Sequence, residues 1–307
     1  MTLFTPSPIT TTMGIRAWAM LLVLSLLWGG SFFLVGVVIN DLPPLTIVFC
    51  RVAIAAIILW LIAFISKIKL PTSREAWLAM FGMGVLNNII PFTLIVWGQT
   101  QIPSGLASIL NATTPLFTVL LAGVLLADEQ ITKTKLIGVL IGFTGAAYMI
   151  GPSAFSGLGN SIAAQLAVLG AAISYSLAGV FGRRFKSMGL HPIATAAGQV
   201  TASSFILAPI VFYIDQPLNL PMPATTTWLA LIALAVFSTA LAYILYFSIL
   251  ATAGATNLVL VTFLIPISAI FLGYFVLGER LDMTHYFGMG IIGVSLLVID
   301  GRLLRRA

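Results

Sequence analysis

The sequence predicts an all-α integral membrane protein: ten transmembrane helices, arranged as two inverted five-helix repeats around a central cavity. Composition is the first observation behind this prediction, since 60% of the 307 residues are hydrophobic and only 7% are charged. Soluble domains carry about a quarter charged residues, so a soluble fold could not cover its surface with this chain. Ten long apolar segments and a repeat of landmark residues are the other two observations. The lipid bilayer is therefore the first partner that the sequence predicts.

The first five helices are predicted from stretches of about 20 mostly apolar residues, the length that crosses the hydrocarbon core. Arg16 precedes the first stretch and no small-residue cleavage site follows it, which indicates a retained helix rather than a cleaved signal peptide. Residues 1–16 are expected to form a cytoplasmic tail. The predicted helices of this first repeat, 17–151, are 17–38, 44–65, 76–97, 104–126 and 134–151.

The second five helices meet the same criterion, and the connections are too short for a soluble domain. Gly138, Gly142 and Gly145 in the fifth helix indicate close helix packing, and we expect the fifth and tenth helices at the periphery. Residues 301–307 form a basic tail. The predicted helices of the second repeat, 162–300, are 162–182, 192–213, 226–249, 255–277 and 284–300.

The distribution of Lys and Arg predicts the orientation. With the N-terminus in the cytoplasm, the basic residues outside the spans gather on the inner side, apart from Arg280, as the positive-inside rule requires. The expected location is the plasma membrane, the inner membrane of a bacterium, with both termini in the cytoplasm. The net charge of +6 is explained by these inner loops, so no nucleic-acid partner is expected.

The two halves of the chain share landmarks at a nearly constant offset. An offset of 151 residues takes Trp77 to Trp228 and Pro115 to Pro266, and the register slips by one before Glu129 matches Glu279. Because each copy has an odd number of helices, the second is inserted upside down, as in secondary transporters with a site near the midplane. A proline inside a helix frees a carbonyl and permits a bend, so Pro115 and Pro266 are predicted hinges.

Three stretches and one residue resemble a known family: "LLWGGSFF", "NATTPLF" and "LADEQITKTKLIGVLIGFTGAAYMI", together with Arg51 in the second helix. They resemble the drug/metabolite transporter superfamily, in particular its ten-helix, two-repeat EamA-type branch. The chain is similar in length and in its short loops to bacterial exporters of amino acids, including aromatic ones. The resemblance implies a secondary transporter that exports its substrate.

Catalytic and cofactor motifs are missing from the sequence. It has no Walker A sequence, no H-E-x-x-H and no G-x-S-x-G. His191 and His285 lie far apart, so we predict no metal site, no cofactor and no enzyme activity. The carboxylates fall at helix ends or in loops, and none lies at the midplane, where a proton-coupled cation antiporter usually holds one.

Arg51 is the one charged residue that lies well inside a predicted span, away from both of its ends. It lies about 10 Å along the second helix from Pro44, at 1.5 Å per residue. An uncompensated Arg near the bilayer centre costs about 2.5–3.5 kcal/mol on insertion scales, so it should face protein or water. Arg51 could anchor a substrate carboxylate, or it could be structural and bond backbone carbonyls of a neighbouring helix; we favour the structural interpretation.

Polar and aromatic residues on the apolar helices predict a pocket. Single Ser and Thr residues in membrane helices more often serve packing, and the aromatic residues fit core packing and pocket lining equally well. The predicted substrate-binding residues are Trp28, Ser31, Asn87, Asn88, Phe92, Asn111, Tyr175, Tyr243 and Tyr246.

A neutral, aromatic-lined cavity of this kind suits small neutral or zwitterionic metabolites such as amino acids, with aromatic ones favoured. The leading hypothesis is thus an exporter of such small molecules that works by alternating access as a monomer. A permease for drug-like compounds or sugars and a non-transporting membrane scaffold remain the alternatives.

Overall fold

The computed structural model describes residues 14–126, 131–150, 160–246, 248–249, 258 and 261–300, and within this part the regular elements are all helical. The first half contains α1, α2, a third span made of α3, η1 and α4, a fourth made of α5 and α6, and α7. Their bounds are α1 Ile15–Val38, α2 Pro44–Ile65, α3 Arg74–Gly84, η1 Val85–Ile89, α4 Ile90–Gln99, α5 Ser104–Asn111, α6 Thr114–Leu125 and α7 Lys133–Ile150.

The second half repeats this order, with two short helices in its connections. Its elements are α8 Asn160–Gly182, α9 Arg184–Ser187, α10 Pro192–Ile214, η3 Pro217–Asn219, α11 Thr225–Ala235, η4 Val236–Leu241, α13 Val261–Leu277 and α14 Met283–Asp300. Each of the ten predicted segments is helical over most of the part that the structure describes, and the segment 104–126 is interrupted at residues 112–113. Seven of these helices are long and apolar enough to cross a membrane, and two shorter apolar helices follow at 264–277 and 283–299.

Local sequence signals account for several helix starts. Pro44 and Pro192 are the first residues of α2 and α10, where a missing N–H costs nothing. The Ser73 side chain accepts a hydrogen bond from the Ala76 N–H at 3.2 Å and so caps α3. At the far end of α13, Gly278 has a φ of +68°, which glycine adopts without strain and which ends the helix.

The fourth span is interrupted just before Pro115. α5 ends at Asn111 and α6 begins at Thr114. The ring of Pro115 would clash with the carbonyl of Asn111 four residues earlier, and proline has no N–H to donate to that carbonyl. That carbonyl instead accepts a hydrogen bond from Thr114 Oγ1 at 2.6 Å. In the second repeat α13 continues through Pro266. The predicted bend at Pro115 is thus present as a break, whereas the helix at Pro266 is continuous.

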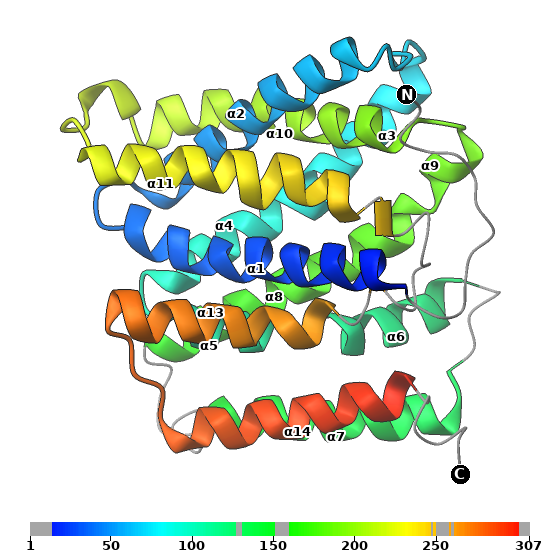
Figure 1. Ribbon diagram of the computed structural model, residues 1–307, viewed down its shortest axis with the longest axis vertical. Helices are drawn as coiled ribbons and strands as arrows, with labels where there is room; N and C mark the ends of the chain where they lie inside the picture. The colour runs from blue at the N-terminus through cyan, green and yellow to red at the C-terminus, as the bar shows by residue number, and fades with distance from the viewer. Residues whose placement is uncertain are drawn as a thin grey trace.

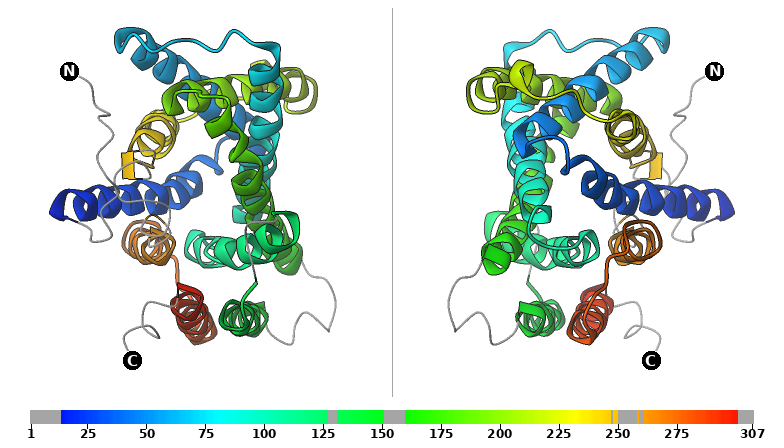
Figure 2. Two further views of the ribbon diagram at one scale, coloured as in Figure 1. Left: turned by 90° about the vertical axis from the view of Figure 1, so that its right-hand side faces the viewer. Right: turned by 90° about the vertical axis from the view of Figure 1, so that its left-hand side faces the viewer.

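The helices run side by side through one bundle, and their connections gather at its two ends (Figure 1). We call the end with loops 39–43, 100–103, 215–224 and 278–282 the Asp41 end, and the other the Arg74 end. The first described helix starts and the last one ends at the Arg74 end. α7 and α14 pair at one edge of the bundle, as the views along the helices also show (Figure 2).

Close approach of α7 to its neighbours requires glycine. A Cβ at Gly142 would lie 2.4 Å from Leu116 Cδ1 and 2.7 Å from Ser295 Oγ of α14, so a larger residue would push the helices apart. A Cβ at Gly138 would likewise lie 2.6 Å from Ile299 Cγ1. The predicted packing role of these glycines and the peripheral position of the pair are confirmed.

Candidate functional site

Two π-helical turns occupy equivalent places in the two repeats. η1 interrupts the third span at Val85–Ile89 and η4 follows α11 at Val236–Leu241. The repeat offset of 151 residues takes Val85 to Val236. A π turn inserts one residue into a helix and changes which side chains face inward, and such turns are frequent at functional sites. Both turns carry polar residues, Asn87 and Asn88 in η1 and Ser238 and Thr239 in η4.

The polar side chains of these turns meet in a hydrogen-bonded network that joins four helical spans. Tyr243 OH donates to Asn88 Oδ1 at 2.9 Å, and Asn88 Nδ2 donates to Ser203 Oγ of α10 at 3.0 Å. Asn87 Nδ2 lies 3.1 Å from Tyr243 OH and 3.2 Å from Gln199 Oε1. The central cluster, as we call it, consists of Arg51, Asn87, Asn88, Gln199, Ser203, Thr239 and Tyr243.

Arg51 enters the central cluster from α2, and its side chain is only 6% exposed. Its Nε donates to Thr239 Oγ1 at 2.9 Å, and its guanidinium carbon lies 3.8 Å from the centroid of the Phe92 ring. Thr239 in turn donates to the Leu234 carbonyl within its own helix. Among the described residues, no backbone carbonyl accepts a hydrogen bond from Arg51, and its bond to Thr239 instead joins α2 to η4. The structural role of Arg51 stays a prediction.

Aromatic rings border the central cluster. Phe92 and Tyr175 pack edge to face with centroids 6.5 Å apart, and Trp28 and Tyr246 lie 5.8 Å apart. Phe92 is buried, whereas Trp28, Tyr175 and Tyr246 are only partly buried. These rings come from α1, α4, α8 and the end of the span that contains α11, so they connect both repeats around the polar groups.

Two predicted site residues lie outside both the central cluster and its aromatic border. Ser31 is buried in α1. Asn111 ends α5, and its Oδ1 is buried without a hydrogen-bond partner in the described structure. Sequence reasoning missed Ser203 altogether, although its spacing of four residues from Gln199 places both on one face of α10. Whether any of these residues binds substrate stays a prediction.

Carboxylates link the two repeats at the Asp41 end. Asp41, after α1, accepts hydrogen bonds from the Ala224 N–H at 3.1 Å and from Thr227 Oγ1 at the start of α11. Asp215, after α10, accepts from the N–H and Oγ1 of Thr46 at the start of α2, both at 2.8 Å. Each carboxylate thus caps a helix of the other repeat, where negative charge is favoured by the helix dipole.

Glu279 makes the third such cap, on α5. Its Oε1 accepts from the Ser104 N–H at 2.9 Å, and its Oε2 accepts from Ser104 Oγ at 2.7 Å and from the Gly105 N–H at 3.3 Å. Its repeat equivalent, Glu129, lies outside the described residues. The hydrogen bonds to Thr227 and then to Ala224 lower the pKa of the Asp41 carboxyl below its usual value.

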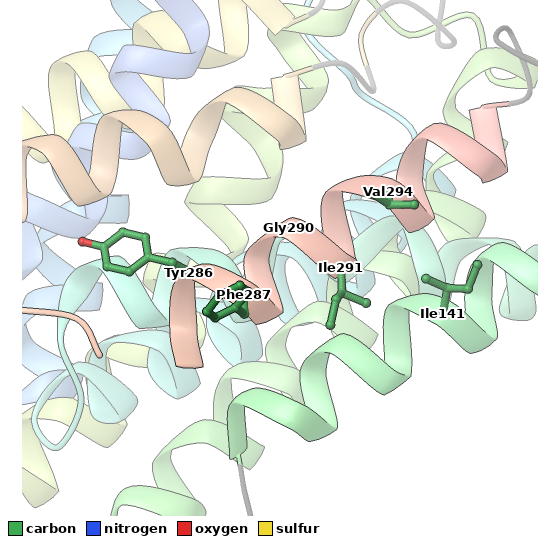
Figure 3. A pocket seen from close by; sticks show the side chains of 6 residues that line it. All are labelled: Ile141, Tyr286, Phe287, Gly290, Ile291 and Val294. Atoms are coloured by element: carbon green, nitrogen blue, oxygen red, sulfur yellow. The ribbon is translucent and has the colours of Figure 1, made fainter. Parts of the chain in front are cut away.

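A groove lies against α7 and α14 (Figure 3), the pair at the edge of the bundle opposite α2 and α10 (Figure 1). Its lining is almost wholly apolar and consists of Ile141, Tyr286, Phe287, Gly290, Ile291 and Val294. Such a surface suits lipid chains and offers few polar groups to orient a transported solute. Within the described residues, no three His, Cys, Asp or Glu side chains gather as a metal site requires.

Comparison with known proteins gives consistent matches along the chain. The sequence profile of the EamA-like transporter family matches residues 16–151 and again 162–300. "Uncharacterized transporter YoaV" of Bacillus subtilis is 25% identical over 269 residues, which cover 87% of this chain and 91% of that protein. "Uncharacterized inner membrane transporter YedA" of Escherichia coli K12 is 25% identical over 282 residues, 91% of this chain and 89% of that protein.

A solved structure described as "Crystal structure of protein" shares the fold. It superposes with a TM-score of 0.68 and covers 95% of this chain and 99% of its own, at 19% identity. At this identity the likeness concerns the fold alone.

Proposed function

The chain belongs to the EamA-like transporter family, and from this membership we propose that it exports small neutral or zwitterionic metabolites, amino acids above all, with aromatic ones favoured. The observation that carries the proposal is the central cluster. It lies where the π turns of both repeats meet, and in two-repeat transporters the substrate site is expected at the repeat interface. Asn87, Tyr175 and Tyr243 are only partly buried there.

The chemistry of the cluster and its border supports amino acids. The amide oxygen of partly exposed Asn87 can accept a hydrogen bond from the ammonium group of a zwitterion, and the hydroxyl of Tyr175 can donate to its carboxylate. The rings of Trp28 and Tyr246 offer a stacking surface, and each ring pair contributes about 0.5–1.5 kcal/mol beyond area burial. That difference favours aromatic side chains without excluding small ones.

Two alternatives make different demands on the site. A permease for sugars or neutral drug-like compounds would use the same aromatic and amide groups, but its solute would carry no negative charge to pair with a buried guanidinium. A membrane scaffold would need none of the polar groups to face a solute, and partly exposed Asn87 and Tyr243 speak against it. Transport in reconstituted vesicles separates the classes, because a scaffold moves no solute.

The proposed transport cycle uses the two repeats, 17–151 and 162–300, as units that rock around the central cluster. Both termini lie in the cytoplasm in this proposal, so the Asp41 end faces outward and the protein resides in the plasma membrane. Single cysteines at Asp128 and Asp282 in a Cys50→Ser background test the orientation. An impermeant maleimide should label Asp282→Cys in intact cells and Asp128→Cys only after permeabilisation; labelling of both from one side contradicts the inverted repeat.

The substrate proposal is tested by uptake into proteoliposomes with a panel of amino acids, including Phe, Trp, Ala and Thr. Trp28→Ala and Tyr243→Ala should reduce transport of Phe and Trp more than that of Ala and Thr. Tyr213→Ala is the matched control, because Tyr213 is 83% exposed at the far end of α10. Equal losses for both classes would place these aromatics in helix packing and the substrate elsewhere.

A further inference from the structure

The charge of Arg51 lacks a counter-ion in the described structure. Its only hydrogen bond there runs from Nε to Thr239 Oγ1, and no described carboxylate forms an ion pair with it. The terminal nitrogens Nη1 and Nη2 have no acceptor among the described residues. The Arg51 side chain as a whole is only 6% exposed, and a cation in such a place normally has its donors satisfied, because unpaired buried charge is costly.

The carboxylates at the Asp41 end do not form an ion pair with Arg51, because each accepts hydrogen bonds from the start of a helix. Asp41, Asp215 and Glu279 cap helices at the Asp41 end. The groups that do surround Arg51 are the Phe92 ring, against which the guanidinium packs, and the neutral hydroxyls of Thr239, Tyr175 and Tyr243, the two tyrosines lying within range of its charge. These contacts hold and orient the cation without neutralising it.

We propose that Arg51 binds the carboxylate of the transported molecule, so that a carboxylate is the group a substrate must carry. The proposal rests on the proposed function, which it narrows from small metabolites to carboxylate-bearing ones. Thr239 holds the Nε side, which leaves Nη1 and Nη2 as a two-pronged donor that matches the two oxygens of a carboxylate. Phe92 fixes the plane of the fork, and the hydroxyl of Tyr175 can donate to the same oxygens.

Ligands that differ in the carboxylate alone test the anchor. The purified protein is titrated with phenylalanine, phenylalaninamide, phenethylamine and 3-phenylpropionate, and affinity is read from the shift in melting temperature. We expect wild type to bind the two carboxylates at least about tenfold more tightly than the amide and the amine. Arg51→Gln should remove this preference, with a loss of roughly 10- to 100-fold for carboxylates, whereas the exposed control Arg74→Gln should leave it unchanged.

The outcomes distinguish the anchor from the broader proposal. Tight binding of phenylalanine that survives in Arg51→Gln overturns the anchor and leaves amino-acid transport standing. Binding of 3-phenylpropionate as tight as that of phenylalanine, lost in Arg51→Gln, supports the anchor and overturns the preference for zwitterions. Equal binding of amide and acid by wild type overturns the anchor.

A second measurement needs no ligand. If Arg51 waits unpaired for a substrate, replacing it by an apolar residue of similar length removes a buried charge and should not weaken the empty protein. Arg51→Met should therefore melt in detergent at the wild-type temperature or above it. Melting several degrees lower would show that Arg51 holds the helices together and would overturn the anchor.

Discussion

The two halves of the fourth span differ in a way that their hydrophobicity does not explain. α5, "SGLASILN", contains small and polar residues, yet every residue from Ser104 to Leu110 is buried. α6, "TPLFTVLLAGVL", is the more apolar sequence, yet only Leu116 is buried. Glu279 caps α5 from the other repeat, and α5 packs against α1, α8 and α13, whereas α6 packs mainly on α8 and α7.

This difference shows what determines burial in a membrane protein. Lipid is as apolar as leucine, so hydrophobicity alone does not drive helices together; small residues allow close approach, and polar groups join helices by hydrogen bonds. α5 has both and lies where the repeats are joined. α5 is therefore the buried half of the span, although α6 is the more apolar one.

The largest expected effect is the loss of stability when a larger side chain is placed in α5, the buried half of the fourth span. Ala107 of α5 is 0% exposed, so Ala107→Leu forces extra volume into a packed contact, which costs about 1–3 kcal/mol. Ala122 of α6 is partly exposed, and Ala122→Leu should be accepted with little change. Melting temperatures of the two variants in the same detergent decide the point, and equal losses would remove the distinction between the halves.

Removing the charge that caps α5 should have the next largest effect. Glu279→Gln weakens the hydrogen bonds to the Ser104 and Gly105 N–H groups and should cost about 1 kcal/mol. The Asp41 end should then open more often, so a cysteine in place of buried Ile102, in a Cys50→Ser background, should react faster with an impermeant maleimide. Glu75→Gln, on exposed Glu75 in the first turn of α3, is the control and should leave the rate unchanged; an equal rate in both variants contradicts the role of Glu279.

The break at Pro115, between α5 and α6, should affect the rate of transport rather than the affinity for substrate. Pro115 interrupts the fourth span, and its repeat mate Pro266 lies inside α13. Replacing both with Ala should restore stiffer helices and slow transport several-fold while substrate affinity stays near wild type. Initial rates and affinities measured on the same preparations test this, and unchanged rates would reduce both prolines to static features.

The smallest expected effect is a dependence on pH at the Asp41 end. The folded pKa of Asp41 lies below its usual value because Thr227 and Ala224 donate to the carboxylate. The ionised form is therefore favoured by folding, so its contribution is present above pH about 4, the unfolded pKa, and is lost as pH falls through the folded value. Between pH 6 and 3, the melting temperature of wild type should fall slightly more than that of Asp41→Asn. Parallel curves of melting temperature against pH would show that the cap contributes nothing measurable.

Much of the candidate site could be predicted because the repeat offset pairs its residues. The offset of 151 residues pairs Asn88 with Thr239, and both lie in the central cluster, where Tyr243 donates to Asn88. The partner of Arg51 was not predictable. A single guanidinium fits a backbone carbonyl, a hydroxyl or a substrate equally well until its neighbours are known, and Thr239 and Phe92 come from spans far away in the sequence.

By itself the sequence determined the membrane setting, the number of helices and the repeat, because hydrophobic length, charge placement and landmark spacing are local or periodic properties. Only the tertiary structure decided where the helices contain π turns, which carboxylate caps which helix, and why Arg51 has no counter-ion among the described residues. Each of these depends on a balance between groups from different spans. Packing decides which groups come within hydrogen-bond distance of a carboxylate or a guanidinium. No local sequence pattern contains this information.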